Sequence, residues 1–261
     1  MSIIEAIILG IVQGLTEFLP VSSSGHLEIG KVILDADVDQ SLLFTVVVHG
    51  ATVLSTIVVF FHEIIKILRG SFSTRINESN LYIFKILLSM LPVVVIGLFF
   101  EEKVESYFSG DLRFVGFMLL ITASLLFLTS LIKKDRNKKI SFLDALIIGI
   151  AQAFAVLPGI SRSGSTIATG ILLGNKREEV AQFSFLMVLL PIIGANILSI
   201  MDIEKGVSFS GNTIVLISGF IAAFISGLIA CKWMIKLVKR GKLYYFAIYC
   251  TIIGLIAIIF A

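Results

Sequence analysis

Two polar stretches interrupt an otherwise apolar chain, and each contains a proline that breaks a helix. Residues 13–26 carry a carboxylate, an imidazole and three serines around Pro20, and residues 157–166 carry Arg162 among serines after Pro158. In lipid, a broken backbone survives only where it is buried in protein or lines a polar cavity, because lipid offers no hydrogen-bond partners. Ionisable residues at that depth are costly and mark functional sites by default. The two stretches carry opposite charges and are together the predicted functional centre.

The rest of the sequence is typical of an α-helical membrane protein that crosses the bilayer several times. Hydrophobic residues make up 57% and charged residues 15% of the chain, its mean hydropathy is +1.03, and a soluble domain usually carries about 25% charge. Runs long enough to cross a hydrocarbon core of about 30 Å lie at 42–61, 83–100, 114–132, 183–200, 213–231 and 243–260. Segments 4–34 and 143–174 differ, because Gly, Pro and Ser divide each into two short apolar halves. They are predicted to be re-entrant hairpins.

The connecting loops predict an orientation. Loops 62–82, 133–142 and 232–242 are rich in Lys and Arg, whereas loops 101–113 and 201–212 are mainly acidic. The positive-inside rule places the basic loops in the cytoplasm, and as topology signals they give no reason to expect a nucleic-acid partner. Six spans satisfy this alternation only if each hairpin returns to the side from which it enters. The first hairpin is then expected to enter from outside and the second from the cytoplasm, with both termini outside.

An internal repeat relates the two halves. Residues 5–26 align with 144–165 at a constant offset of 139, with these identities: Ala6/Ala145, Ile8/Ile147, Gly10/Gly149, Ile11/Ile150, Gln13/Gln152, Ser22/Ser161, Ser24/Ser163 and Gly25/Gly164. We predict a single all-α membrane domain made of repeat one, 1–139, and repeat two, 140–261. Each repeat is a re-entrant broken-helix hairpin plus three transmembrane helices. Because three crossings reverse the direction, the repeats have inverted topology, as in many secondary transporters.

The breaks predict an anion site. Ser22, Ser23 and Ser24, like Ser161 and Ser163, suit the N-cap of the half-helix that follows. A helix N-terminus presents unpaired N–H groups and a partial positive charge, and so it binds anions. Arg162 adds a planar fork of donors suited to bidentate contact with a phosphate. The predicted ligand is a phosphate or diphosphate.

The remaining polar side chains of the first break favour phosphoryl transfer. Ser23 could attack the terminal phosphorus with His26 as base, while Glu17 orients His26 or holds a cation, and Arg162 stabilises the oxygens of the transition state. Spacing alone does not separate Ser23 from its two serine neighbours as nucleophile, and His26 could itself attack. His49 lies in an apolar span, where a structural hydrogen bond is the favoured interpretation.

These residues resemble the undecaprenyl-diphosphate phosphatases linked to bacitracin resistance, over essentially the whole chain. The family's first motif is Glu or Gln, three residues, Glu, then Pro-x-Ser-Ser-x-Gly-His, matched here by Gln13, Glu17, Pro20, Ser22, Ser23, Gly25 and His26. Its second motif, Pro-Gly-x-Ser-Arg-Ser-x-x-Thr, is matched by Pro158, Gly159, Ser161, Arg162, Ser163 and Thr166.

The resemblance implies hydrolysis of undecaprenyl diphosphate to undecaprenyl phosphate and phosphate, which recycles the lipid carrier for cell-wall synthesis and gives bacitracin resistance. It also implies a multi-pass protein of the bacterial cytoplasmic membrane with a site open to the extracytoplasmic side. A divalent cation, Mg or Ca, is often invoked for the family, and no organic cofactor is expected. Because Gln13 stands where many members carry Glu, a cation here would use Glu17, phosphate oxygens and water.

The predicted site and partners follow from these motifs. The catalytic set is Glu17, Ser23, His26 and Arg162, and the substrate-binding set is Gln13, Ser22, Gly25, Ser161, Ser163 and Thr166, with Glu17 also the candidate metal ligand. The partners are a polyprenyl diphosphate lipid and the bilayer, with a homodimer left open. The main alternative is a transporter or flippase that carries a polyprenyl phosphate or another anion through the same inverted-repeat site. A non-catalytic lipid-binding or resistance protein is a third class. A nucleophile beside a base favours the hydrolase, because transport needs neither.

Overall fold

The computed structural model describes residues 1–34, 38–72, 77–107, 111–132, 138–204 and 213–260, and these residues are helical with no strand. The helices are α1 (Ile3–Phe18), α2 (Ser23–Leu34), α3 (Val38–Val59), α4 (Phe61–Ser71), α5 (Glu78–Phe99), α6 (Glu101–Glu105), α7 (Leu112–Ser130), α8 (Phe142–Phe154), α9 (Arg162–Leu172), α10 (Arg177–Met187), α11 (Leu189–Glu204), α12 (Thr213–Lys239) and α13 (Tyr244–Phe260). The all-α fold class is confirmed.

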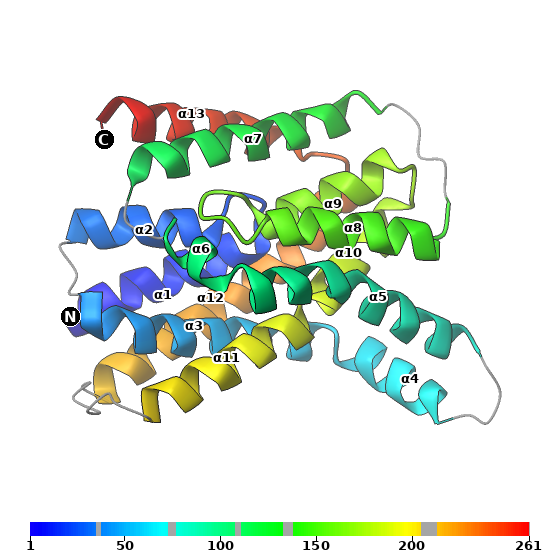
Figure 1. Ribbon diagram of the computed structural model, residues 1–261, viewed down its shortest axis with the longest axis horizontal. Coiled ribbons are helices and arrows are strands. Elements are labelled where there is room, and N and C mark those ends of the chain that lie inside the picture. The colour runs from blue at the N-terminus through cyan, green and yellow to red at the C-terminus, as the bar shows by residue number, and fades with distance from the viewer. Residues whose placement is uncertain (35–37, 73–76, 108–110, 133–137, 205–212, 261) are drawn as a thin grey trace.

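Two helical hairpins meet near the middle of the molecule. Helices α1 and α2 run to and from one end, on the left in Figure 1, and α8 and α9 run to and from the opposite end. The breaks between them lie at residues 19–22 and 155–161. The structure therefore contains both broken segments predicted at 4–34 and 143–174, and it points them at each other.

The first helix of each hairpin begins with the same hydrogen-bonded cap. Ser2 accepts from the backbone N–H of Glu5, and the Glu5 carboxylate accepts from the N–H of Ser2. Ser141 and Asp144 repeat this capping box at the start of α8. Such caps satisfy N–H groups that the helix itself leaves unpaired, so the short local pattern fixes where each hairpin begins.

Glycines let the hairpins approach the long helices closely. Helix α1 packs against α12, and α8 packs against α5. A side chain at Gly149 of α8 would collide with the Ser89 carbonyl oxygen of α5, and one at Gly10 of α1 would meet the backbone of Gly219 in α12. Small residues are the usual means of close helix contact in membranes.

The surface of the protein is apolar and its interior is partly polar. Large hydrophobic side chains are exposed along α5 and α13, among them Leu91, Leu98, Ile252 and Ile259, while Gln13, Glu17, Thr52, Ser55, Ser89 and Thr122 are buried. This pattern reverses that of a soluble domain, where polar residues cover the outside. It is the pattern expected of helices that face lipid.

The structure agrees only in part with the prediction of six membrane-spanning helices. Within the described residues, α5, α7, α12 and the segment Arg177–Leu198 are long and apolar enough to span a membrane, and the bent pair Leu43–Val59 and Phe61–Ser71 makes a fifth if it is one span. Helix α13, predicted as a sixth span, has 17 residues and is shorter. The chain is a multi-pass membrane protein, and its described residues contain four or five such helices.

Two predicted loops are largely helical. The span predicted at 42–61 ends at Val59, and the chain bends by 74° into α4, which occupies part of the predicted loop 62–82. Helix α12 continues to Lys239 and takes in most of the predicted loop 232–242. Lys is a good helix former and suits a helix C-terminus, where it faces the negative end of the dipole. The predicted loop 201–212 falls mostly outside the described residues.

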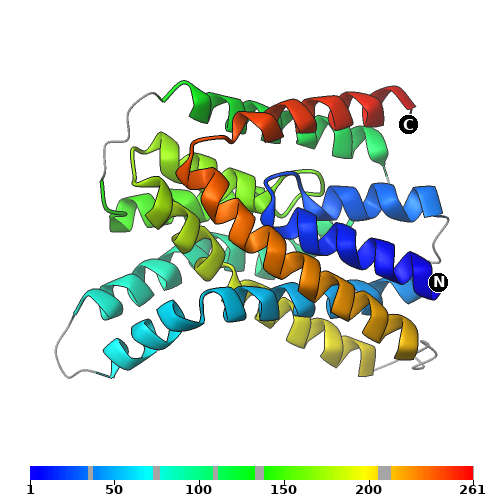
Figure 2. The same ribbon diagram turned by 180° about the vertical axis from the view of Figure 1, so that it is seen from behind.

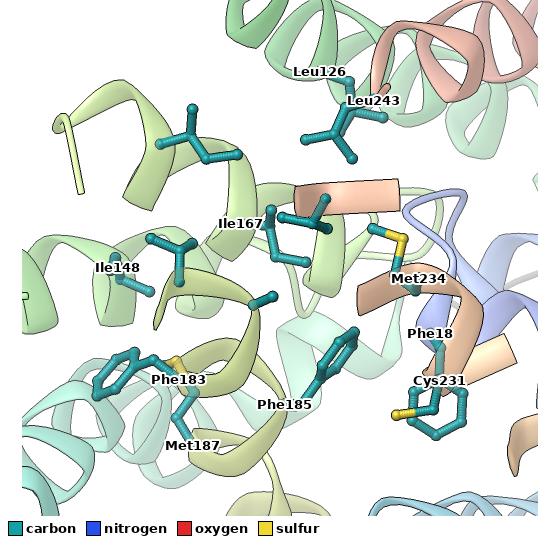
Figure 3. Packing of buried hydrophobic residues seen from close by; sticks show 14 of the residues in the cluster. Phe18, Leu126, Ile148, Ile167, Phe183, Phe185, Met187, Cys231, Met234 and Leu243 are labelled. Carbon is teal, nitrogen blue, oxygen red and sulfur yellow. The ribbon is translucent and has the colours of Figure 1, made fainter. Parts of the chain in front are cut away.

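An apolar cluster lies beside the meeting point of the hairpins (Figure 3). Phe185 of α10 stands between Phe18 of α1 and Phe60, with ring centroids 5.7 Å and 6.0 Å away. Ile167 of α9 and Met234 of α12 are fully buried in the same cluster. Phe18 follows Glu17 directly, so this packing fixes the end of α1 that carries the carboxylate.

The close contact of α8 with α5 predicts a difference between two glycine variants. Gly149→Ala should destabilise the protein by about 1–3 kcal/mol, because the added methyl group overpacks the crossing. Gly97→Ala is the control, since nothing lies within 4 Å of a Cβ built at Gly97 of α5; it should leave stability unchanged or raise it slightly through helix propensity. Thermal unfolding in detergent measures the stability of both variants. Equal unfolding temperatures would contradict the close contact between α8 and α5.

Candidate active site

Each hairpin turns through a residue with a positive φ and is capped by a serine. Ser22 has a φ of 70°, and its hydroxyl accepts from the N–H of Gly25 at 3.2 Å. In the second hairpin the left-handed residue is Gly159, at φ 93°, and Ser161 accepts from the N–H of Gly164 at 3.0 Å. A non-glycine residue with a positive φ is uncommon and costs energy. Of the five serines predicted to suit an N-cap, Ser22 and Ser161 cap the helices that follow, and Ser22 does so within a strained turn.

The two tips touch each other. The Ser163 hydroxyl donates to the Leu19 carbonyl at 3.3 Å, and a Cβ built on Gly164 would lie 3.2 Å from the Cβ of Pro20. Helix α7 supports the second tip, because Thr122 accepts from the N–H of Ser161 at 2.9 Å. Segments far apart in sequence thus form one continuous polar centre.

A buried ion pair joins the hairpins. The guanidinium of Arg162, the first residue of α9, donates through Nη2 to Oε1 of Glu17, near the end of α1. The other carboxylate oxygen, Oε2, accepts from Gln13 Nε2 at 2.9 Å and from the Ser23 hydroxyl at 2.8 Å. Glu17 is 7% exposed. An unpaired charge at such depth would be strongly destabilising, so each partner stabilises the other.

His49 of α3 lies against the same carboxylate. Its Nε2 is 3.8 Å from Oε2 of Glu17, and its Nδ1 bonds the Thr45 carbonyl at 2.8 Å. Because a carbonyl only accepts, Nδ1 carries the proton, and a neutral His49 has its lone pair on Nε2, facing Glu17. The predicted structural hydrogen bond is present, and His49 is also part of the centre.

His26 points elsewhere. Its Nδ1 donates to the Ser22 carbonyl at 2.8 Å, and its Nε2 lies 2.8 Å from the hydroxyl of Tyr249 in α13. The two rings stack with centroids 5.6 Å apart. Both ring nitrogens are thus engaged away from Ser23, and the structure does not bring His26 and Ser23 together as the predicted base and nucleophile. The role of His26 in catalysis stays a prediction.

A cavity of about 450 Å³ lies beside the ion pair, within the usual range for ligand sites. Its polar wall consists of Glu17, Ser23, Ser24, Thr45, His49, Gln152, Arg162 and Asn196. Its apolar wall includes Val46, Val93, Val156, Ile160, Pro191 and Ile192. A ligand with a charged head and an apolar chain suits such a wall.

The predicted substrate-binding residues fall into two groups. Gln13 contacts Glu17 directly. The other five are not among the residues that line the cavity and take part in caps and contacts that hold the tips: Ser22, Gly25, Ser161, Ser163 and Thr166. Thr166 bonds Ser184 of α10 at 2.6 Å. The structure therefore assigns most of these residues to the support of the site, and their contact with substrate stays a prediction.

Five of the described polar residues on the cavity wall are absent from the predicted catalytic and substrate-binding sets: Ser24, Thr45, His49, Gln152 and Asn196. The sequence favours a structural role for His49, since an isolated histidine in an apolar span carries no motif. Gln152 was recognised only as the repeat partner of Gln13, and that identity is the signal that could have identified it. It is 2% exposed, and neither atom of its amide group has a hydrogen-bond partner among the described residues.

The site does not offer a preformed metal centre. No group of three or more His, Cys, Asp or Glu side chains that could hold an ion occurs in the described part of the chain. Among the described residues that line the cavity, Glu17 is the single carboxylate, and both its oxygens are already engaged. Mg²⁺ and Ca²⁺ need several oxygen ligands, so these side chains alone do not fit a divalent cation.

The ion pair predicts a large loss of stability when one partner is removed. Arg162→Met should cost about 3–5 kcal/mol, because Glu17 is left charged and unpaired in the interior. The control is Lys139→Met, which removes an exposed pair with Glu78 whose side chains are 77% and 92% exposed; it should change little. Thermal unfolding of both proteins in detergent measures the difference, and an Arg162→Met protein as stable as wild type would contradict the buried pair.

Comparison with known proteins places the chain in a family. The family described as bacitracin resistance protein BacA matches residues 6–256. The chain is 54% identical over 257 residues to the undecaprenyl-diphosphatase of Bacteroides fragilis, covering 98% of this chain and 97% of the relative. It is 56% identical over 263 residues to that of Christiangramia forsetii, covering 100% and 99%, and 42% identical over 260 residues to that of Methanococcus vannielii, covering 98% and 99%. The chain belongs to the BacA family of bacitracin resistance proteins.

Proposed function

We propose that this protein is a membrane hydrolase that removes the terminal phosphate of undecaprenyl diphosphate, giving undecaprenyl phosphate and inorganic phosphate. The observation that carries the proposal is the convergence of Ser23, Glu17 and Arg162 on one cavity wall. Relatives named undecaprenyl-diphosphatase support this reaction and not the carrier alternative. The product is the lipid carrier for cell-wall synthesis, and its recycling accounts for bacitracin resistance.

Ser23 is the proposed nucleophile. Its hydroxyl donates to Glu17 at 2.8 Å, so the carboxylate is placed to accept the proton as the serine oxygen attacks the terminal phosphorus. The bond from that phosphorus to the bridging oxygen breaks, and undecaprenyl phosphate leaves. Water then attacks the phosphoserine, releasing phosphate and restoring Ser23. Attack by His26 has less support, because both of its ring nitrogens bond Ser22 and Tyr249.

Arg162 is the proposed clamp for the phosphate. One terminal nitrogen, Nη2, bonds Glu17, while Nη1 is buried without a partner in the described residues. A bound phosphate can take up this donor and compete with Glu17 for the other. A planar guanidinium suits two parallel bonds to phosphate oxygens, and it stabilises the charge that these oxygens carry in the transition state.

Inverted repeats are the proposed architecture. Exchange of the repeats carries α1 onto α8 and α5 onto α12, and the packed pairs α8–α5 and α1–α12 are related by this exchange. The capping boxes at Ser2 and Ser141 and the serine caps at Ser22 and Ser161 recur at the same offset of 139 residues. The repeats 1–139 and 140–261 remain the proposed division of one membrane domain.

The proposed location is the bacterial cytoplasmic membrane. Both termini are then on the outer side, and the cavity opens to that side. The two chain ends lie at one end of the molecule, and α8 begins and α4 ends at the other, in both views (Figures 1 and 2). The basic residues Lys66 and Arg69 lie on α4, and Lys138 and Lys139 lie just before α8, which supports a cytoplasmic position for that end.

Two expectations remain open as proposals. A Mg or Ca ion near Glu17 would have to be held largely by phosphate oxygens and water, so we derive no step through it. A homodimer is compatible with the apolar surface, which equally suits lipid.

The catalytic assignment is tested by phosphate release from undecaprenyl diphosphate by purified protein in detergent. Wild type should turn over, and Ser23→Ala should lose at least about a thousandfold in kcat, because the attacking oxygen is gone. Repeating the assay with a metal chelator tests whether turnover requires a divalent cation. If Ser23→Ala retained turnover and His26→Ala lost it, the nucleophile would be reassigned. If the wild-type protein binds the lipid but releases no phosphate, the transporter or flippase alternative would be favoured.

The orientation is tested by labelling single cysteines in intact cells with a thiol reagent that does not cross membranes. Ser106→Cys should react and Lys139→Cys should not, since the two exposed residues are assigned to opposite faces. The native Cys231 and Cys250 are buried and provide a low background. The reverse labelling pattern would invert the proposed topology.

A further inference from the structure

Gln152 is a buried polar side chain that the proposed chemistry does not use. It lies two residues before the end of α8 and lines the cavity with Glu17, Ser23 and Arg162. It is 2% exposed, and neither its Nε2 nor its Oε1 has a hydrogen-bond partner among the described residues. Buried polar atoms are nearly always paired, and each exception in a native protein calls for an explanation.

The first repeat shows what Gln152 lacks. Its repeat counterpart, Gln13, donates its Nε2 to Glu17 at 2.9 Å. Glu17 itself corresponds to Val156 at the same offset of 139 residues. The second hairpin therefore has a glutamine at this place but no carboxylate for the glutamine to bond. The residue lines the cavity, and its buried amide keeps its full hydrogen-bonding capacity for a ligand that reaches it.

We propose that Gln152 binds the diphosphate group of the substrate beside Ser23 and Arg162. Its Nε2 donates to a non-bridging oxygen of the diphosphate, which is an acceptor at neutral pH. Its Oε1 can accept from a water molecule or from a protonated oxygen of the same group. This inference rests on the proposed function, and it adds a neutral contact to the charged clamp of Arg162.

Replacement of Gln152 separates a binding role from a structural one. Gln152→Met keeps the approximate length and volume of the side chain and removes both polar atoms. Because those atoms have no partner among the residues that the structure describes, the variant should be as stable as wild type or more stable. Its KM should rise about tenfold or more with kcat nearly unchanged, as expected when a contact made equally in the ground state and transition state is lost.

Ser165→Ala is the matched control. Ser165 of α9 also has a buried hydroxyl without a partner in the described residues, and it is not on the cavity wall. Its replacement should leave KM at the wild-type value. Gln152→Glu is the second variant, and its added negative charge should raise KM further by repelling the diphosphate.

A binding measurement without turnover completes the test. Inorganic pyrophosphate should raise the unfolding temperature of Ser23→Ala, and adding Gln152→Met should abolish that shift. An unchanged KM together with a retained shift would overturn the proposal, and so would a loss of several degrees in the ligand-free Gln152→Met protein. If wild type releases no phosphate, the proposed hydrolase fails, and the pyrophosphate shift alone then decides the role of Gln152.

Discussion

The buried ion pair between Glu17 and Arg162 is the interaction on which the rest of the site depends. It joins the end of α1 to the start of α9, two helices that belong to hairpins entering from opposite ends of the molecule. Removing either partner leaves the other without its counter-charge in a largely buried site, which is costly. The broken backbone beside the pair is also satisfied internally, by serine caps and by contacts between the tips.

The chemistry of the protein lies where its repeats differ. Positions that build the hairpins are shared, such as the caps Ser22 and Ser161. At the same offset of 139, Ser23 corresponds to Arg162, and Glu17 corresponds to Val156. In the proposed mechanism one tip supplies the nucleophile Ser23 and the carboxylate of Glu17, and the other supplies the Arg162 clamp, so two related tips form one asymmetric site.

Local patterns predicted the hairpins and their caps, because a Pro-Ser-Gly break acts on its own neighbours in sequence. The direction of His26 was not predictable, since it depends on Tyr249 far along the chain. The approach of His49 to Glu17 depends likewise on how α3 packs. The bend after Val59 was missed because the apolar run continues through it. Long-range packing decides such features, and hydropathy does not report it.

The contact between the two tips is tested most directly by a disulfide bond. Cysteines at Pro20 and Gly164, in a protein whose Cys231 and Cys250 are replaced by alanine, should form an intramolecular bond under mild oxidation. The Cβ positions lie close, at 3.2 Å, near the separation of about 3.5–4.5 Å that a disulfide spans. Cysteines at Pro20 and Gly97, where no atom lies within 4 Å of an added Cβ, are the negative control. Failure of the Pro20–Gly164 pair to cross-link in folded protein would contradict the meeting of the hairpins and the site built on it.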